Sequence, residues 1–546
     1  MKKLTCLLLT LAMLLSISTA LAATGDEGLG YGFNPTGERI VDDEITVKVL
    51  YQRNTRHGDF NNYWFIDYVA EKTGIRLEFE LVETAAWNER VSIAFATDDY
   101  PDVFMNGMST TIINKYAEEG YLVNLEPLIK KYAPFTVSEY NKYPELVKEV
   151  YAADGGIYYM PSINASPRDL VTTYPSWINA QWLKNLNLEM PTTLDELYTV
   201  LKAIKTQDAN LDGDPNNEIP VVSSNGGKFS TLVISSLGYV DNRNAIADDR
   251  YVYVPTTETY KAYLKWMNRF YSEGLLDNEY FTSSGENLRA KESTGLAAMI
   301  DMTPYEVLAA TYEEFKGLSP LTSDLNQTKM WPAQSACRLS WGTCVVTDKC
   351  QYPEAIVRLI DWFYTVDGSR AVRAGCEYGT WKDEQGVEYG WEIVTPADQT
   401  ADGHLIAKLH MGDYSSYWAC RLGEIGPTNL PFNSTDAVND IIIAGDKMNL
   451  WLYNQVMDSG VVAARTFSLP QLSFTDDEST RKSVYLDLTN YVDNMESKFI
   501  KGDLDIDANW EDFQAQLQKY DVNGMCEIYQ AALDRYNARP GQITVD

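Results

Sequence analysis

Residues 45–81 carry the pattern that decides the fold: I-T-V-K-V-L at 45–50, a helical stretch over about 62–72, and I-R-L-E-F-E-L at 75–81. The first six residues read as a strand, and Gly74 stops the helix before the next strand. Apolar and charged side chains alternate over 75–81, which is the period of a strand with one buried face. Two strands joined by a helix predict a parallel pair with a right-handed crossover. The chain therefore begins as an α/β unit.

Further elements extend this unit toward a second lobe. A helix is expected over 86–97, and the short stretch 101–104 starts another strand. In open α/β sheets, ligands bind in the crevice beyond the carboxyl ends of the strands. Glycines and a proline then interrupt residues 150–166, which indicates a crossing between lobes.

Length and charge limit the classes of function. After a leader is removed, about 520 residues remain, which is too many for one compact core and predicts two or more lobes. The 77 acidic and 45 basic residues give a net charge of −32, which argues against nucleic acid and anionic membrane surfaces as partners. A hydrophobic content of 45%, with 36 Tyr and 13 Trp, argues against disorder.

Residues 1–22 have the features of a secretory signal peptide. Two lysines precede an apolar run over 4–15, and A-L-A follows at 20–22. The apolar run is shorter than the roughly 20 residues that span a membrane. The one early cysteine, Cys6, lies near the start of the run instead of after it, so no lipobox is present. We expect cleavage after Ala22 and an exported, non-acylated protein.

The order of elements suggests where the lobes begin and end. Residues 23–43 are Gly-rich and polar and are expected to form a flexible linker. The first lobe is expected over 44–160 and the second over 161–295. The small and apolar stretch 295–302 then reads as a strand returning to the first lobe, whose second part is expected over 296–345. Residues 346–546 would complete the second lobe with the C-terminal helices.

Six cysteines remain after cleavage: Cys337, Cys344, Cys350, Cys376, Cys420 and Cys526. The first three lie close together in sequence, but their spacing is not CxxC and no histidine is nearby, which argues against zinc. An even count in an exported chain permits a disulfide, and a large domain does not need one. Whether a bridge forms among the first three stays open.

Residues 208–218, D-A-N-L-D-G-D-P-N-N-E, predict a calcium loop. Oxygen-bearing side chains recur at every second position and Gly213 lies at the sharp turn, as in loops that offer calcium about six to eight oxygens. The candidate ligands are Asp208, Asn210, Asp212, the Asp214 carbonyl, Asn216 or Asn217, and Glu218. Because they are contiguous, the ion would be structural. The alternative is a solvated acidic turn.

Catalytic motifs are absent from the sequence. It contains no GxSxG, P-loop or HExxH and only three histidines. A second acidic run at 503–511 lacks a glycine and leads into an amphipathic helix, so we interpret it as helix capping. The enzymatic alternative is a glycoside hydrolase or polysaccharide lyase, since glycoside hydrolysis needs only two carboxylates.

Aromatic residues in irregular segments favour a carbohydrate groove, because sugar rings stack their C–H faces on Trp and Tyr. Core packing is the alternative for each of them singly. The candidate ligand-binding residues are Asn61, Trp64, Tyr159, Trp177, Trp341 and Trp391. Asn61 and Trp64 are included because a helix start presents free N–H groups.

Five stretches resemble a known family: W-I-N-A-Q-W-L at 177–183, L-N-L-E-M-P-T-T-L-D-E-L at 186–197, E-I-P at 218–220, C-Q-Y-P-E-A-I-V-R-L-I-D-W-F-Y at 350–364 and K-F-I-K-G-D-L-D-I-D-A-N-W at 498–510. They resemble bacterial extracellular solute-binding proteins of family 1, in the group that includes alginate oligosaccharide-binding proteins and LipO-type lipoproteins. The similarity extends from about residue 45 to 537.

The resemblance implies an α/β, two-lobed, type II periplasmic-binding-protein fold with discontinuous lobes and a cleft between them. It implies a monomeric, non-enzymatic protein that binds an oligosaccharide and delivers it to the permease of an ABC importer. Alginate-binding relatives hold calcium in the matching loop, and one extra residue here makes Asn217 the better match than Asn216. The missing lipobox departs from most Gram-positive relatives, and divergence over 370–430 places ligand specificity there. A sugar sensor or adhesin without a transporter is a further alternative.

Overall fold

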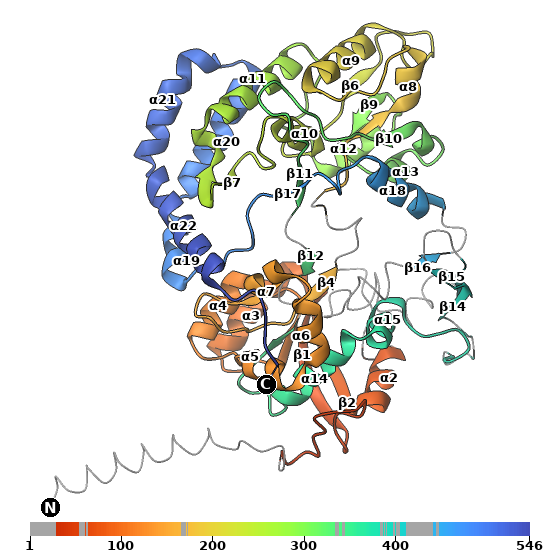
Figure 1. Cartoon of the computed structure of the whole chain (residues 1–546), viewed down its shortest axis with the longest axis vertical. Helices are drawn as coiled ribbons and strands as arrows, with labels where there is room; N and C mark the ends of the chain where they lie inside the picture. The colour runs from red at the N-terminus through yellow and green to blue at the C-terminus, as the bar shows by residue number, and fades with distance from the viewer. Residues whose placement is uncertain are drawn as a thin grey trace, which may run out of the picture.

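Two lobes, one above the other, make up the molecule (Figure 1). The computed structural model describes residues 29–53, 61, 64–164, 171, 173–333, 338–340, 344–382, 386, 388, 390–396, 399, 405–410, 441–443 and 447–545. Each lobe has its own hydrophobic core: one contains residues between 33–163, 344–376 and Ile543, the other residues between 171–333 and 452–536. The chain therefore crosses between the lobes several times, and both lobes are discontinuous.

The sheet of the first lobe contains the predicted βαβ unit. Its strands are β1 (Ile45–Arg53), β2 (Ile75–Glu83), β3 (Val103–Met105) and β13 (Val345–Val346), in the order β13-β3-β1-β2. β1 lies parallel to β2 and β3, and β13 is antiparallel to β3. α2 (Trp64–Thr73) forms the crossover. Gly74 ends it with a φ of 83°, where a Cβ would lie 2.5 Å from the carbonyl oxygen of Val41.

Helices cover the sheet of the first lobe. They are α3 (Trp87–Ala96), α4 (Thr110–Glu118), α5 (Glu126–Tyr132), α6 (Pro134–Tyr140), α7 (Pro144–Val150), α14 (Pro353–Phe363) and α15 (Val366–Ala374), with a short 3₁₀ turn over Thr84–Ala86. α14 is fixed to α6 because the buried Asp361 carboxylate accepts the N–H of Thr136 at 2.7 Å and its hydroxyl at 2.9 Å. The helix predicted over 86–97 is confirmed.

The sheet of the second lobe consists of β5 (Trp177–Asn179), β6 (Ile219–Val221), β9 (Ala297–Ile300) and β10 (Phe315–Gly317), in the order β10-β5-β9-β6. β9 pairs antiparallel with β5 and parallel with β6. The prediction that this apolar strand returns to the first lobe is wrong, because its four buried side chains complete the core of the second lobe. Residues 346–376, expected in the second lobe, pack into the first.

The second lobe is mostly helical. Its helices are α8 (Ala180–Asn185), α9 (Leu194–Thr206), α10 (Lys228–Ser236), α11 (Glu258–Ser272), α12 (Gly285–Glu292), α13 (Pro304–Val307), α18 (Lys447–Asp458), α19 (Asp476–Ser483), α20 (Leu486–Lys501), α21 (Ile506–Lys519) and α22 (Val522–Ala538), with 3₁₀ turns over Val254–Thr256 and Tyr312–Glu314. β7 (Asn244–Ala247) and β8 (Arg250–Tyr253) form a hairpin. The Asp505 carboxylate accepts the N–H of Ala508 at 2.7 Å at the start of α21, which confirms that the second acidic run caps a helix.

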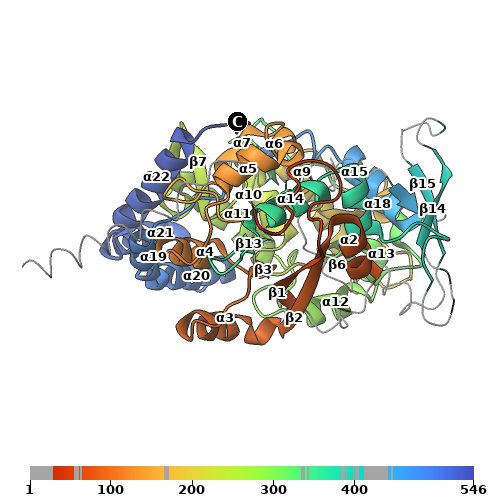
Figure 2. The ribbon, with the colours of Figure 1, turned by 90° about the horizontal axis from the view of Figure 1, so that it is seen from below.

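Two strand pairs lie between the lobes (Figure 1). β4 (Ser162–Asn164) is antiparallel to β12 (Arg338–Ser340), and β11 (Trp331–Ala333) is parallel to β17 (Arg465–Phe467). We refer to these four strands as the crossing strands. At the edge of the molecule, β14 (Gly390–Thr395), β15 (Leu405–His410) and β16 (Ile441–Ile443) form a small sheet (Figures 1 and 2). Downstream of α22, the chain returns to the first lobe, where Ile543 is buried.

Residues 29–43 are packed against the first lobe, so the expected linker is wrong over this part. Phe33, Ile40 and Val41 are buried in the first core. The Arg358 guanidinium also donates to the carbonyl of Gly37 at 2.5 Å. This segment packs on the lobe because apolar side chains are spaced among its glycines, a feature that the prediction of a polar linker overlooked. Residues 1–28 lie outside the described part, and the signal peptide stays a prediction.

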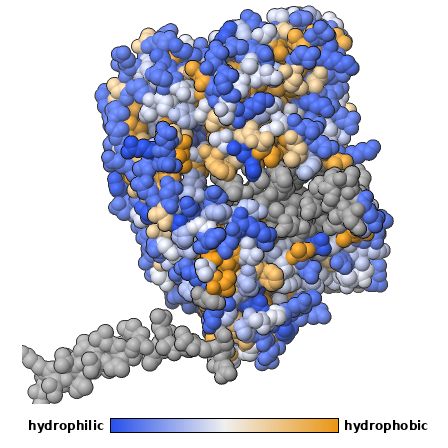
Figure 3. Space-filling model, in the orientation of Figure 1, coloured by the Kyte–Doolittle hydropathy of each residue, from blue (hydrophilic) through white to orange (hydrophobic). Residues whose placement is uncertain are grey.

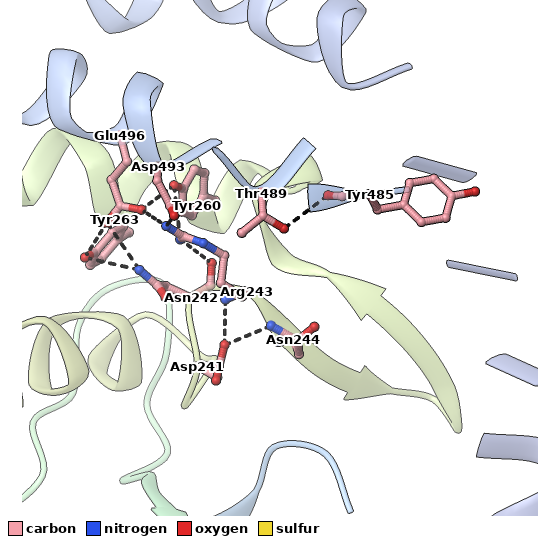
Figure 4. Close-up of polar contacts among 10 residues, drawn as sticks. All are labelled: Asp241, Asn242, Arg243, Asn244, Tyr260, Tyr263, Tyr485, Thr489, Asp493 and Glu496. Carbon is pink, nitrogen blue, oxygen red and sulfur yellow. Dashed lines mark hydrogen bonds and ion pairs between the residues drawn. The ribbon is translucent and has the colours of Figure 1, made fainter. Parts of the chain in front are cut away.

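A buried carboxylate fastens the C-terminal helices to the second lobe (Figure 4). Glu496 on α20 accepts the hydroxyls of Tyr260 and Tyr263 on α11 at 2.8 and 3.2 Å. Arg243, just before β7, pairs with the same carboxylate and with Asp493. One acidic residue therefore connects three segments that are far apart in the sequence.

Two expectations concern membranes and disulfides. No helix within the described residues combines the length and apolarity needed to cross a membrane. The thiols of Cys344, Cys350 and Cys526 are free, so no bridge joins Cys344 to Cys350. Cys337 and Cys420 lie outside the described residues.

Candidate functional site

A hollow of about 280 Å³ in the first lobe is lined by aromatic and charged side chains. Four aromatic residues border it: Trp64, Tyr68, Trp362 and Trp391. The rings of Trp64 and Tyr68 stack with centroids 4.5 Å apart, because positions i and i+4 share one face of α2. Burial raises the pKa of the Tyr68 hydroxyl, which therefore stays a hydrogen-bond donor.

Trp391 reaches this hollow from the start of β14. Its indole Nε1 donates to the Gly375 carbonyl at 3.1 Å, and its main-chain N–H donates to the Cys376 carbonyl. Gly390 makes this approach possible: its φ is 131°, and a Cβ would lie 2.5 Å from the Cys376 carbonyl oxygen. The guanidinium carbon of Arg370 lies 5.9 Å from the Trp391 ring centroid. Two residues singled out from the sequence, Trp64 and Trp391, thus line one hollow.

The second lobe presents an aromatic cluster of its own. Trp177 on β5 stacks on Trp451 of α18 at 5.4 Å, and Trp451 meets the rings of Tyr312 and Tyr305 edge-on at 5.1 and 6.4 Å. The indole N–H groups of Trp177 and Trp451 are both buried and find no acceptor among the described residues. A buried indole N–H normally has a partner. The cluster therefore has donor capacity that the described protein atoms leave unused.

Lys228 lies beside this cluster at the start of α10. Its ammonium is 5.3 Å from the Trp177 ring centroid, and burial lowers the pKa of Lys228 to about 8. The Asp301 carboxylate caps the same helix, accepting the main-chain N–H groups of Lys228 and Ser224 at 3.0 and 3.1 Å. The second lobe thus combines aromatic faces with polar donors.

The two aromatic surfaces lie on the same side of the molecule, but α2, which carries Trp64 and Tyr68, lies on the part of the first lobe farther from the second lobe (Figure 1). α13 and α18, which carry Tyr305 and Trp451, lie directly across from α15, which borders the hollow (Figures 1 and 2). Figure 3 shows hydrophobic surface along the lower edge of the upper lobe. Apolar surface with a few polar groups is typical of small-molecule sites between lobes.

The predicted calcium loop forms a compact cluster of oxygens away from these surfaces. The Asp208 carboxylate accepts the main-chain N–H groups of Asp212 and Gly213 at 3.1 and 3.0 Å. The side-chain amides of Asn210 and Asn217 both contact Asp212 Oδ2, at 3.0 and 2.6 Å. The hydrogen bond from Asn217 is the main reason that the pKa of Asp212 is lowered.

The donor set of this loop fits a hard cation. Glu218 is buried; its Oε1 accepts the Ala209 N–H at 2.7 Å, whereas Oε2 is buried without a partner in the described structure. Asn216 donates to Asp214, whereas Asn217 donates to Asp212; of these two asparagines, Asn217 is therefore the one within the oxygen cluster. A half-turn of an Asn amide exchanges its nitrogen for its oxygen. Within the described residues no three His, Cys, Asp or Glu side chains form a metal cluster, and two of the oxygens expected here belong to Asn.

Residues 58–369 match the model of a family described as bacterial extracellular solute-binding protein. This match covers more than half of the chain. The chain belongs to this family. The match confirms the resemblance stated from the sequence motifs.

A known relative matches most of the length of this solute-binding protein. A fructooligosaccharide ABC transporter substrate-binding protein, FusA of Streptococcus pneumoniae serotype 4, is 23% identical over 496 residues, 88% of each chain. The solved structure of a FusA EF-hand mutant with fructo-nystose has a TM-score of 0.65 at 22% identity and covers 90% of this chain and 100% of that one.

Two further solved structures share the fold. An extracellular solute-binding protein from Bifidobacterium longum subsp. infantis has a TM-score of 0.74 at 18% identity, covering 91% of this chain and 99% of the other. The alginate-binding protein AlgQ2, solved without calcium ion, has a TM-score of 0.63 at 20% identity with the same coverage. The predicted two-lobed type II periplasmic-binding-protein fold is confirmed.

Some of the aromatic and polar residues singled out from the sequence have structural roles in this solute-binding protein. Asn61 pairs through its side chain with both the N–H and the carbonyl of Phe79, at 2.8 and 3.1 Å, and so covers the free edge of β2. Tyr159 is buried in the first core, where its hydroxyl donates to the Glu149 carbonyl. The Trp177 ring is wholly buried beneath Trp451. Trp341 lies outside the described residues.

Several residues of the two aromatic surfaces were not predicted from the sequence: Tyr68, Trp362, Arg370, Tyr305, Tyr312 and Trp451. Tyr68 could have been found, since it lies one helical turn after Trp64. The sequence around Trp451 gives no such indication, because an aromatic residue on an amphipathic helix is normally interpreted as part of the hydrophobic core. Only the folded chain brings it onto Trp177.

Proposed function

We propose that this chain is the substrate-binding subunit of an ABC importer and that it binds a carbohydrate, an oligosaccharide, between its two lobes. The observation that carries the proposal is that the aromatic cluster around Trp451 lies across from α15, which borders the hollow lined by Trp64 and Trp391. The relative FusA, which matches over 88% of the chain, carries a fructooligosaccharide transporter name.

The chemistry of the two surfaces suits sugar rings. Tryptophan and tyrosine offer flat apolar faces to the C–H side of a pyranose or furanose, and fixed polar groups set its orientation. The ammonium of Lys228, which lies beside the Trp177 ring, is a donor for sugar oxygens. A ligand that contacts both lobes stabilises the closed arrangement of the lobes and so favours hinge closure.

We propose that the protein binds its sugar without converting it, as a binding protein and not as an enzyme. Its family is named for solute binding, and its relative FusA for substrate binding in transport. We propose an exported monomer that hands its sugar to membrane-embedded permease subunits and has no nucleic-acid partner. The net charge of −32 agrees with the last point.

We also propose that the loop at 208–218 holds a structural calcium ion. The ligands would be Asp208, Asn210, Asp212, the Asp214 carbonyl, Asn217 and Glu218. Support comes from the buried, unpartnered Oε2 of Glu218 and from two relatives, FusA, solved as an EF-hand mutant, and AlgQ2, solved without calcium ion. A bound ion would supply the positive charge that this cluster of oxygens lacks, and so hold the segment between α9 and β6 in place.

A thermal-shift screen of the mature protein tests the proposed function. The panel contains fructooligosaccharides, milk oligosaccharides, alginate oligosaccharides, N-glycans and mixed oligopeptides. A ligand at 100 times its dissociation constant adds about 2.7 kcal/mol to the free energy of unfolding. We expect at least one oligosaccharide to raise the melting temperature. A shift with oligopeptides and with none of the sugars would refute the proposed ligand class.

A further inference from the structure

A second cavity, of about 150 Å³, lies on the far side of the crossing strands from the aromatic surfaces. Its walls come from both lobes: α7 of the first lobe, the β7–β8 hairpin and the end of α22 in the second, and the chain just after β17. In both Figure 1 and Figure 2, α7, β7 and α22 lie on the opposite side of the molecule from α15 and α18. An occupant of this cavity would touch both lobes without entering the proposed sugar site.

Apolar side chains form most of the wall. Leu533 and Tyr536 on α22 are buried, and Ile246 on the hairpin is half-buried. Phe467, the last residue of β17, remains 47% exposed beside them. A large aromatic ring left in solvent next to buried apolar residues provides surface that a ligand can cover.

Three carboxylates border the same cavity. Glu145 on α7 and Asp249 in the hairpin turn have no ion-pair partner among the described residues, and Glu149 accepts the Gln471 N–H at 3.3 Å. Burial raises the pKa of Tyr536, and the nearby carboxylates of Glu149 and Glu145 raise it further. No lysine or arginine belongs to the described lining.

Two cations lie close by but have other contacts. The Lys148 ammonium is 5.5 Å from the centroid of the Tyr536 ring. The Arg539 guanidinium donates to the carbonyls of Lys148 and Ala152 at 2.9 and 2.8 Å. Neither of them forms an ion pair with Glu145 or Asp249 in the described structure.

The hairpin turn keeps one of these carboxylates in place at an energetic cost. Asp248 and Asp249 both have left-handed φ values, 50° and 59°. Two-residue turns of this kind favour Asn-Gly or Asp-Gly, since left-handed φ is unfavourable for residues with a Cβ. Glycine at 249 would relieve the turn and remove the carboxylate from the cavity.

We propose that this cavity binds a small organic cation, an alkyl or arylalkyl primary amine. The ammonium lies toward Glu145 and Asp249, and the hydrocarbon part packs against Phe467 and its apolar neighbours. Charge-assisted hydrogen bonds to carboxylates and contacts of a cation with aromatic rings both favour the charged amine over a neutral analogue. The proposal does not depend on the identity of the sugar.

Titration calorimetry of the full mature protein at pH 7 tests the proposal, with 3-methylbutylamine and phenethylamine as probes. Their neutral analogues 3-methylbutanol and 2-phenylethanol serve as controls. We expect the amines to bind and the alcohols to bind at least about tenfold more weakly. No heat with either amine, or equal affinity for amine and alcohol, would overturn the proposal.

A matched pair of variants separates binding from folding. Asp249→Asn should weaken amine binding about tenfold or more and leave the unfolding temperature unchanged or higher, because Asn tolerates left-handed φ. Asp248→Asn makes the same change of charge in the same turn but does not line the cavity, and it should keep the wild-type affinity. Equal loss of affinity in both variants, or no loss in Asp249→Asn, would contradict the proposed site.

Discussion

The guanidinium of Arg243 lies 2.5 Å from the carboxylate of Glu496, and this ion pair joins the start of the β7–β8 hairpin to helix α20 (Figure 4). Glu496 is 1% exposed, and its carboxylate contacts this guanidinium and two tyrosine hydroxyls. Removal of the cation leaves an uncompensated buried charge, which is strongly destabilising.

We therefore expect Arg243→Ala to lower the free energy of unfolding by about 3–5 kcal/mol. Urea denaturation monitored by circular dichroism measures the change. Arg250→Ala, an exposed arginine in the same hairpin, is the control and should cost less than about 1 kcal/mol. Similar losses in the two variants would mean that the pair does not hold α20 in place.

Trp64→Ala should weaken oligosaccharide binding about tenfold or more, because it removes one stacking face of the hollow in the first lobe. Trp266→Ala provides the control: this tryptophan packs beside Phe270 in the second lobe, outside both aromatic surfaces. The dissociation constants are compared by calorimetry after far-ultraviolet circular dichroism confirms that both variants are folded. Unchanged affinity in Trp64→Ala would remove the hollow from the proposed site.

Calcium removal should lower the melting temperature, since an ion that binds only the folded loop adds to its stability. The measurement is a thermal unfolding curve before and after chelation, with metal analysis of the purified protein. Asp212→Asn should melt lower than wild type in calcium and lose most of the response to chelation, whereas Asp503→Asn, in the acidic run that caps α21, should respond as wild type does. The calcium proposal fails if chelation leaves the curve unchanged and no metal is detected.

A pH dependence follows from the buried Glu292. Burial raises the pKa of its carboxyl from 4.5 to about 7, although it accepts the N–H groups of Asp301 and Met302. Between about pH 4.5 and 7 the folded chain therefore holds a proton that the unfolded chain releases, and the free energy of unfolding falls as the pH rises.

Relative to Glu292→Gln, which cannot titrate, the wild type should lose on the order of 2 kcal/mol between pH 5 and pH 7. Urea unfolding at pH 5, 6 and 7 measures this difference. Glu306→Gln, an exposed carboxylate nearby, should follow the wild-type curve. Parallel pH curves for wild type and Glu292→Gln would show that Glu292 does not titrate in this range.

The fold could be predicted where the sequence has a clear local period. The parallel pair β1–β2 and helix α9 with its Thr193–Glu196 capping box form as expected, since local hydrogen bonds and one buried face determine them. The assignment of strands to lobes could not be predicted in the same way. β9 is apolar on both faces and would suit either sheet; its partners β5 and β6 are fixed only by tertiary packing.

The candidate site could be predicted only in part, and for a similar reason. Trp64 and Trp391 do line one hollow, but Asn61 covers a strand edge and Tyr159 packs in the core. Aromatic and amide side chains make the same contacts with a ligand as with the rest of the protein, so the sequence alone does not separate the two roles. The Trp177–Trp451 stack joins residues from distant parts of the chain. Its location in space requires the fold.

Isothermal titration calorimetry with the oligosaccharide that gives the largest thermal shift tests the central claim most directly. The mature wild-type protein should bind one oligosaccharide per chain, and chromatography should recover the sugar unchanged after incubation. Saturable binding with intact sugar is the result expected of a transport binding protein. No binding of any oligosaccharide in the panel, or its recovery as shorter products, would contradict the account.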